Sequence, residues 1–200
     1  MNAFVLAGGQ SMRMGRDKAL LEFAGKPLIA HALDKLRAIG QAPRIVASRP
    51  DLAAFAPVLP DAYPQAGPLG GIASALAVSD SEQNLFLAID LPALPLSFLV
   101  WLAQRAEITN ALATIPRLQG LPQPLCAVYS RALLPHLRTA LAEGDAKVMR
   151  AVERAGTIDS FDIESVAAAE SWPSPHGWFA NLNTPAEFQN AVLEQSTRIQ

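Results

Sequence analysis

The amino-acid sequence predicts an α/β domain with a mostly parallel β-sheet. Short runs of strand-forming residues alternate with segments whose apolar residues recur at helical spacing, which is the pattern of βαβ units. Half of the 200 residues are apolar and 17% are charged, as in an ordinary globular chain. No repeat or proline-rich linker divides the sequence, so we expect a single domain over residues 1–200.

The expected elements follow one another along most of the chain. Strands are predicted at Ala3–Ala7, Arg44–Ala47, Asn84–Ile89, Ala111–Ile115 and Leu125–Tyr129. The first helix should have Pro27 in its first turn and end at Gly40, and further helices are predicted at Leu69–Val78, at Leu96–Ala106 and from Thr184 toward Leu193. Residues 157–177 are predicted as a loop because of Pro173 and Pro175, and this loop is a candidate for meeting a substrate.

Charge and cysteine content exclude several classes of protein. The 16 Lys and Arg residues against 18 Asp and Glu residues give a net charge of −2, so there is no basic field for nucleic acid and a small ligand is favoured. The single cysteine, Cys126, excludes a disulfide-stapled secreted domain and is expected to be core packing in a cytoplasmic protein. The apolar stretch Leu85–Ala103 contains Asp90, Pro92 and Pro95, so we expect a strand, a turn and a helix rather than a membrane span.

A glycine-rich, basic segment follows the first strand directly. Residues 6–18 read LAGGQSMRMGRDK. Gly8 and Gly9 allow backbone N–H groups to approach a polyphosphate, and Arg13 and Lys18 supply positive charge. Lys18 is followed by Ala19, and the glycine spacing is not G-x-G-x-x-G, so the segment is neither a P-loop nor a dinucleotide-binding fingerprint. Its chemistry is that of an anion site.

Carboxylates and amides come after other predicted strands. Asp90 ends the apolar run 85–89, where a carboxylate suits Mg²⁺ at the edge of a parallel sheet, although an aspartate there can also cap the turn before Pro92. Asp61, taken alone, is a turn residue. The segment Gly67–Gly71 opens a helix with small residues that serve either close ligand approach or tight packing. Asn181 and Asn183 alternate with Leu182, so their side chains point to one side.

These motifs together resemble a known family. The run LAGGQSMRMGRDKALLEFAGKPLI at 6–29 is similar to the signature of the molybdenum cofactor guanylyltransferases, which are MobA-like nucleotidyltransferases. The resemblance continues in PD at 60–61, GPLGG at 67–71, DLP at 90–92, QPLCAVY at 123–129 and NLNTP at 181–185. It implies a three-layer Rossmann-like nucleotidyltransferase domain, and an enzyme that transfers GMP from GTP to the terminal phosphate of molybdopterin and releases pyrophosphate.

The resemblance also assigns roles to individual residues. It implies that Leu6, Ala7, Gly8 and Gly9 hold the nucleotide, that Lys18 contacts its phosphates, and that Asp61 contacts the nucleotide. Arg13 is expected to neutralise charge at the reacting phosphate. Asp90 is expected to hold Mg²⁺, and by analogy Asn183 is the candidate for a second metal ligand. The family often has Asn after the second strand, where this chain has Ala47 and Ser48, so Ser48 is the residue left to make that contact.

Other interpretations remain open at this stage. The same chemistry could use CTP with molybdopterin or a nucleotide with a sugar phosphate, and a different class would be a non-catalytic nucleotide-binding assembly module. The acceptor is expected across residues 117–130 and 157–183, and transient contacts with other proteins of cofactor biosynthesis are expected. Trp172 and Trp178 bracket the proline-rich loop and are expected to anchor it rather than to contact a pterin.

Overall fold

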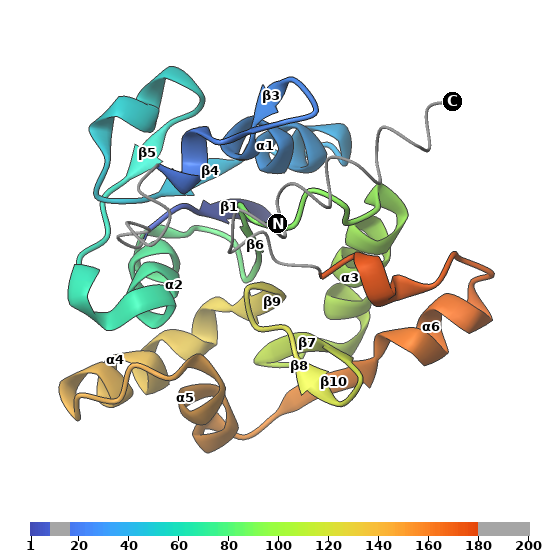
Figure 1. The fold of residues 1–200 in the computed structure, drawn as a ribbon. Helices are drawn as coiled ribbons and strands as arrows, with labels where there is room; N and C mark the ends of the chain where they lie inside the picture. The colour runs from blue at the N-terminus through green and yellow to red at the C-terminus, as the bar shows by residue number, and fades with distance from the viewer. Residues whose placement is uncertain (9–16, 180–200) are drawn as a thin grey trace.

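The computed structural model describes residues 1–8 and 17–179, and an eight-stranded sheet lies at the centre of this part of the chain (Figure 1). The sheet has the order β10-β7-β9-β6-β1-β4-β5, and β8 pairs with the end of β7. Its strands are β1 (Asn2–Leu6), β4 (Arg44–Val46), β5 (Val58–Leu59), β6 (Gln83–Ala88), β7 (Ala113–Leu118), β8 (Leu121–Pro122), β9 (Cys126–Ser130) and β10 (Ile158–Asp162). A separate hairpin consists of β2 (Glu22–Phe23) and β3 (Lys26–Pro27).

Most neighbouring strands of the large sheet are parallel. β1 lies between β4 and β6 and is parallel to both, β4 is parallel to β5, and β7 is parallel to β10. β9 is antiparallel to β6 and to β7. The predicted mostly parallel sheet is therefore confirmed, with strand boundaries shifted by one to three residues at their ends.

Six helices of the described chain cover the two faces of the sheet, which gives three layers (Figure 1). Their apolar residues belong to two separate core clusters. One cluster joins α1 (Leu28–Ala38), α3 (Leu96–Thr109) and α6 (Ile163–Ala169) to one face of the sheet, and the other joins α2 (Gly67–Val78), α4 (Leu134–Ala142) and α5 (Val148–Ala155) to the opposite face. The predicted three-layer α/β class is confirmed.

The alternation of side chains along β1 explains how a short strand serves both cores. Val5 packs in the cluster under α1 and α3, whereas Phe4 and Leu6 pack in the cluster under α2, because successive side chains of a strand point to opposite faces. Central strands buried on both faces need apolar residues at every position. β1 has this pattern, and it carries the glycine-rich segment at its carboxyl end.

Two expectations about the elements need correction, and one helical region was not predicted. Residues 157–177 are not a loop throughout, because they contain β10 and α6. β10 is an edge strand with one buried residue, Phe161, so it lacks the apolar run that marks a central strand. α6 is short, and Asp162 caps its N-terminus by accepting a hydrogen bond from the Ser165 amide at 3.0 Å. Pro27 lies in β3 and precedes α1 instead of standing in its first turn. Residues 134–155 form α4 and α5, for which the sequence analysis made no prediction.

Two expectations remain, one for the C-terminal helix and one for the apolar stretch 85–103. The helix expected from Thr184 lies outside the described residues. Residues 85–103 form the end of β6, a turn and the start of α3, as predicted. Among the residues described, we find no helix with the length and apolar character needed to span a bilayer.

Candidate active site

The carboxyl ends of four neighbouring parallel strands meet at one edge of the sheet. In the strand register, Leu6 of β1 pairs with Val46 of β4 and with Ala88 of β6, and Val46 pairs with Leu59 of β5. The segments that leave these strand ends carry the candidate residues Ala7, Gly8, Asp61 and Asp90. Because ligands of open parallel sheets bind at the carboxyl edge, this topology brings candidates from distant parts of the sequence to one place.

Lys18 and Asp90 form an ion pair at this edge. The Lys18 Nζ lies 2.8 Å from the Asp90 Oδ2, and the two side chains are only 11% and 16% exposed. Lys18 opens a short 3₁₀ turn, η2 (Lys18–Leu20), and Asp90 comes two residues after β6. The residues predicted as the phosphate contact and the metal ligand therefore lie in direct contact, although 72 positions separate them in the sequence.

The first residues of the glycine-rich segment differ in exposure. The side chains of Leu6 and Ala7 are buried, and the Ala7 amide donates to the Val46 carbonyl at 3.1 Å, which continues the pairing of β1 with β4. Gly8 is exposed at the edge. Three further candidates, Gly9, Arg13 and Asn183, lie outside the described residues.

Asp61 is held in a turn against the start of α2. Its Oδ1 accepts a hydrogen bond from the Tyr63 amide at 2.8 Å, and the Ser74 hydroxyl lies 3.1 Å from the same oxygen. The Ser74 hydroxyl oxygen also accepts from the Ala62 amide at 2.9 Å, so the turn is fastened to the helix at two points. These hydrogen bonds orient the Asp61 carboxylate. The sequence without the family resemblance had indicated only that Asp61 is a turn residue.

Gly70 and Gly71, in the first turns of α2, have different surroundings. A Cβ on Gly70 would overlap the Tyr63 carbonyl oxygen and lie 2.8 Å from the Tyr63 Cβ, so the turn after β5 packs directly on the helix backbone there. A Cβ on Gly71 would lie 3.4 Å from side-chain carbons of Leu6 and Val46, which is close to ordinary contact. Of the two interpretations left open for this segment, tight packing accounts for Gly70.

Arg49 is a residue of this edge that the sequence analysis missed. It follows β4, and its guanidinium pairs with Asp17 and with Asp51. The hydrogen bond from Arg49 holds the pKa of the Asp17 carboxyl below its usual range. Ser48, the residue before it, is exposed at the same edge. A basic residue after a strand is too common a pattern to be selected from a sequence alone.

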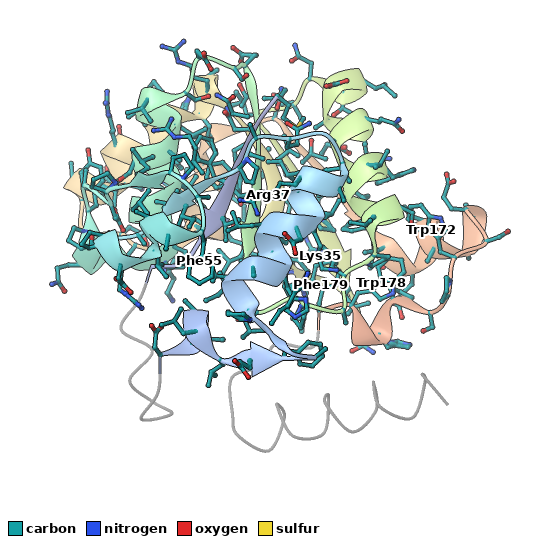
Figure 2. The ribbon with its side chains drawn as sticks, turned by 90° about the horizontal axis from the view of Figure 1, so that it is seen from above. Lys35, Arg37, Phe55, Trp172, Trp178 and Phe179 are labelled. Atoms are coloured by element: carbon teal, nitrogen blue, oxygen red, sulfur yellow. The ribbon has the colours of Figure 1, made fainter. Side chains whose placement is uncertain are left out.

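The segments expected to meet the acceptor contact each other. Gln119, in the turn between β7 and β8, has its Nε2 3.3 Å from the Nδ1 of His176. Trp172 and Trp178 pack against Phe98 of α3 with ring centroids 6.4 and 5.7 Å away, and Figure 2 shows both next to this helix. Trp178 is 7% exposed, so the expectation that it anchors the chain is confirmed, while Trp172 is half-buried.

A cavity of about 600 Å³ lies beside the Asp61 turn. It is bounded on one side by the 3₁₀ turn η4 (Pro64–Ala66) and on the other by the end of α4 and the turn before α5. Its lining includes Tyr63, Gln65, Arg138, Leu141 and Asp145. The other lining residues are small or apolar, so the cavity is mostly apolar, with one cation, Arg138, and one carboxylate, Asp145.

The donor set of the site fits Mg²⁺ better than a transition metal. In the part of the chain that the structure describes, no three His, Cys, Asp or Glu side chains are grouped to hold a metal. Asp90 offers one carboxylate at the sheet edge, and Mg²⁺ is commonly bound by one or two carboxylates together with phosphate oxygens. Cys126 is buried in β9, as predicted, and burial raises the pKa of its thiol.

Comparison with known proteins places the chain in a family. Residues 3–158 match the MobA-like NTP transferase domain. A molybdenum cofactor guanylyltransferase from Syntrophotalea carbinolica is 31% identical over 94% of this chain and 89% of its own length, and a probable one from Nostoc sp. is 35% identical over 97% and 90%.

Solved structures agree with this assignment. The structure of molybdopterin-guanine dinucleotide biosynthesis protein A from Archaeoglobus fulgidus superposes with a TM-score of 0.83 at 26% identity, covering 98% of this chain and 100% of that one. A 2-C-methyl-D-erythritol 4-phosphate cytidylyltransferase from Thermus thermophilus, at 14% identity and a TM-score of 0.70, covers 96% and 98% and shares the fold. The chain is a nucleotidyltransferase that belongs to the MobA-like family, within the molybdenum cofactor guanylyltransferases.

Proposed function

We propose that the protein transfers GMP from GTP to the terminal phosphate of molybdopterin, forming the guanine dinucleotide of the cofactor and releasing pyrophosphate. The observation that carries this proposal is the contact between Lys18 and Asp90 at the end of β6, beside the strand from which the glycine-rich segment departs. A cation for phosphates and a carboxylate for a divalent metal are the two groups that nucleotidyl transfer requires most. Relatives of nearly the same length that carry the guanylyltransferase name support the choice of substrates.

The reaction needs little covalent chemistry from the protein. An oxygen of the acceptor phosphate attacks the α-phosphorus of GTP, the bond from that phosphorus to its bridging oxygen breaks, and pyrophosphate leaves with the electron pair. A phosphate monoester is already anionic at neutral pH, so no strong general base is required. The work of the chain is to position the two anions and to neutralise the charge that develops between them.

Individual residues have complementary parts in this proposal. Leu6, Ala7, Gly8 and Gly9 would hold the base and ribose, with Asp61 as a further nucleotide contact. Lys18 and Arg13 would neutralise the phosphates. The orientation of Asp61 by the Tyr63 amide supports its role, because a carboxylate fixed by hydrogen bonds recognises a donor more selectively than a mobile one.

Asp90 would hold Mg²⁺, with Asn183 proposed as a second ligand. When bound, the metal supplies charge neutralisation at the phosphoryl oxygens. The Asp90 carboxylate has its Oδ2 against Lys18, so it must change this contact, or use its other oxygen, to serve a metal. The ion pair thus keeps both side chains at the site edge and in place for a metal-bound triphosphate.

The acceptor has two candidate locations beside the triphosphate. One is the region of Gln119 and His176, where the segments 117–130 and 157–177 contact each other. The other is the cavity next to the Asp61 turn, which contains Arg138. We further propose that the protein acts in the cytoplasm, as one domain over residues 1–200, and exchanges its cofactor with other biosynthetic proteins through transient contacts.

Nucleotide selection tests the proposal most directly. We expect GTP with Mg²⁺ to raise the melting temperature more than ATP, CTP or UTP, because a ligand that binds the native state stabilises it by mass action. Pyrophosphate release should require both GTP and a molybdopterin acceptor. Equal stabilisation and turnover with CTP would exclude guanine specificity, while binding without pyrophosphate release would favour a non-catalytic assembly module.

A further inference from the structure

Arg49 has no part in the proposed reaction, yet its guanidinium forms an ion pair with Asp17, the residue directly before Lys18. We propose that Arg49 is a positioning residue that fixes the direction of Lys18 through Asp17. This inference rests on the proposed function only in that Lys18 is taken as the triphosphate contact. The side-chain contacts that support it extend from the end of β4 to the end of β6.

The first step is that the guanidinium is itself held in place. Arg49 directly follows the loop that leaves β4, and it precedes the 3₁₀ turn η3 (Pro50–Ala54). Its Nε donates to the Asp51 Oδ1 at 3.1 Å and its Nη2 to the Asp51 Oδ2 at 2.5 Å. Two parallel hydrogen bonds to one carboxylate fix the plane of a guanidinium. The Nη2 is thereby aimed at Asp17, with which it forms a second ion pair.

The second step is that Asp17 uses its two oxygens for two purposes. Its Oδ2 accepts from Arg49, while its Oδ1 accepts from the Ala19 amide at 3.1 Å and so caps the turn η2. A three-residue 3₁₀ turn has too few hydrogen bonds to hold its own geometry. The orientation of the first residue of this turn therefore depends on the carboxylate that caps it.

The third step is that the first residue of the turn is Lys18. Its side chain extends across the edge to Asp90 and is largely buried. The chain of contacts thus connects the end of β4, the segment after the glycine-rich loop and the end of β6. β1, which lies between β4 and β6, is the strand from which the glycine-rich loop departs (Figure 1).

Exposure distinguishes positioning from stabilisation. About a third of the Arg49 side chain and of the Asp17 side chain is exposed, 35% and 31%, and ion pairs with this exposure contribute little to folding stability. A small misplacement of a charged group at a reacting phosphate has a much larger effect on binding and rate. We therefore expect the pair to matter for GTP and little for the melting temperature.

The test is a set of GTP titrations with Mg²⁺ on the full chain, by calorimetry, with melting temperatures measured in parallel. Arg49→Gln should weaken GTP binding about tenfold, which corresponds to the loss of one well-placed charged contact. Asp17→Asn should reproduce this loss, because Asn can still cap the turn but offers no charge to Arg49. Arg49→Lys should recover part of the affinity. Asp51→Asn should cause a smaller loss than Arg49→Gln, because it weakens the hydrogen bonds that fix the guanidinium plane while the ion pair with Asp17 remains.

The decisive measurement repeats Arg49→Gln in a Lys18→Ala background. If Arg49 acts through Lys18, the second substitution should change GTP affinity by less than about twofold there. An undiminished tenfold loss in that background, or no loss from Arg49→Gln in the wild type, would overturn the inference and leave the proposed function standing. Lys18→Ala without effect on GTP affinity would overturn both the inference and the role proposed for Lys18.

Discussion

Replacing Lys18 with Met and Asp90 with Asn, singly and together, measures the interaction on which the candidate site depends. The two charged atoms are 2.8 Å apart and the side chains are less than one-fifth exposed. A hydrogen bond between charged groups with this degree of burial is worth roughly 1.5–3 kcal/mol, whereas an exposed pair is worth about 0–1 kcal/mol. We therefore expect a coupling free energy of about 2 kcal/mol between the two substitutions.

The assay is urea unfolding of the two single variants and the double variant, with melting temperatures recorded in parallel. In a domain of this size 1 kcal/mol corresponds to roughly 2–4 °C, so each single variant should melt about 4–8 °C lower than the wild type. The double variant should lose about 2 kcal/mol less than the sum of the two single losses, because the interaction can be lost only once.

A matched control is present in the same protein. Lys26 and Asp34 form an ion pair of the same type at 2.9 Å, but their side chains are 59% and 46% exposed. The equivalent cycle with Lys26→Met and Asp34→Asn should give a coupling of about 0–1 kcal/mol. Asp34 also lies 3.4 Å from the Arg37 guanidinium, so the control cycle is read for the Lys26–Asp34 term alone, and its small value would show how much exposure weakens a pair of this type.

Additive losses at Lys18 and Asp90 would refute this reasoning. If Asp90 served only to cap its turn, Asn would replace it almost without loss, since Asn caps turns nearly as well. Turnover gives a second criterion, because Asp90→Asn should lower it by at least roughly a hundredfold while nucleotide affinity falls much less. Near-normal turnover of a folded Asp90→Asn protein would exclude Asp90 as the metal ligand.

Three further predictions concern the surroundings of the site. Gly70→Ala should cost about 1–3 kcal/mol in urea unfolding, because its Cβ would press on Tyr63, whereas Gly71→Ala should cost clearly less; equal costs would show that the close approach is not a constraint. Cys126 should resist thiol reagents in the native protein at neutral pH and react only on unfolding, since burial raises the pKa of its thiol; rapid native labelling would contradict this. In the folded chain the pKa of Asp17 is lowered from 3.8, mainly by its hydrogen bond from Arg49. The stability that this interaction contributes is therefore present above pH 3.8 and is lost as the pH falls through the folded pKa. The stability difference between wild type and Asp17→Asn should be smaller at pH 3 than at pH 7, and a constant difference would contradict this reasoning.

The central part of the fold was predictable because its strands are buried on both faces. β1 is apolar at four of its five positions, β6 contains the apolar run 85–88, and α1 has a clear apolar face, so periodicity was sufficient to find them. β10 was not found because an edge strand buries one face at most, and its sequence, IDSFD, contains three polar residues. Patterns of hydrophobicity carry little information where the burial itself is partial.

The candidate residues could be selected from the sequence, but their contacts could not. Lys18 and Asp90 were selected because each stands in a motif, yet nothing in the sequence shows that they touch. Arg49 was missed because its importance arises from the parallel register of β1 and β4, which brings the segment after β4 to the side of Asp17. Spatial relations of this kind come from tertiary structure, and residue spacing does not encode them.

The ion pair also has a consequence for the form in which a triphosphate can bind. An ammonium or a carboxylate buried to this degree is costly by itself, so Lys18 and Asp90 stabilise each other before any ligand arrives. A polyanion attracts Lys18 and thereby leaves the Asp90 carboxylate facing phosphate oxygens of the same charge. Such a contact is favourable only if a cation lies between the two groups. With Lys18 in its proposed role as the triphosphate contact, we therefore expect GTP to bind together with a divalent cation rather than alone.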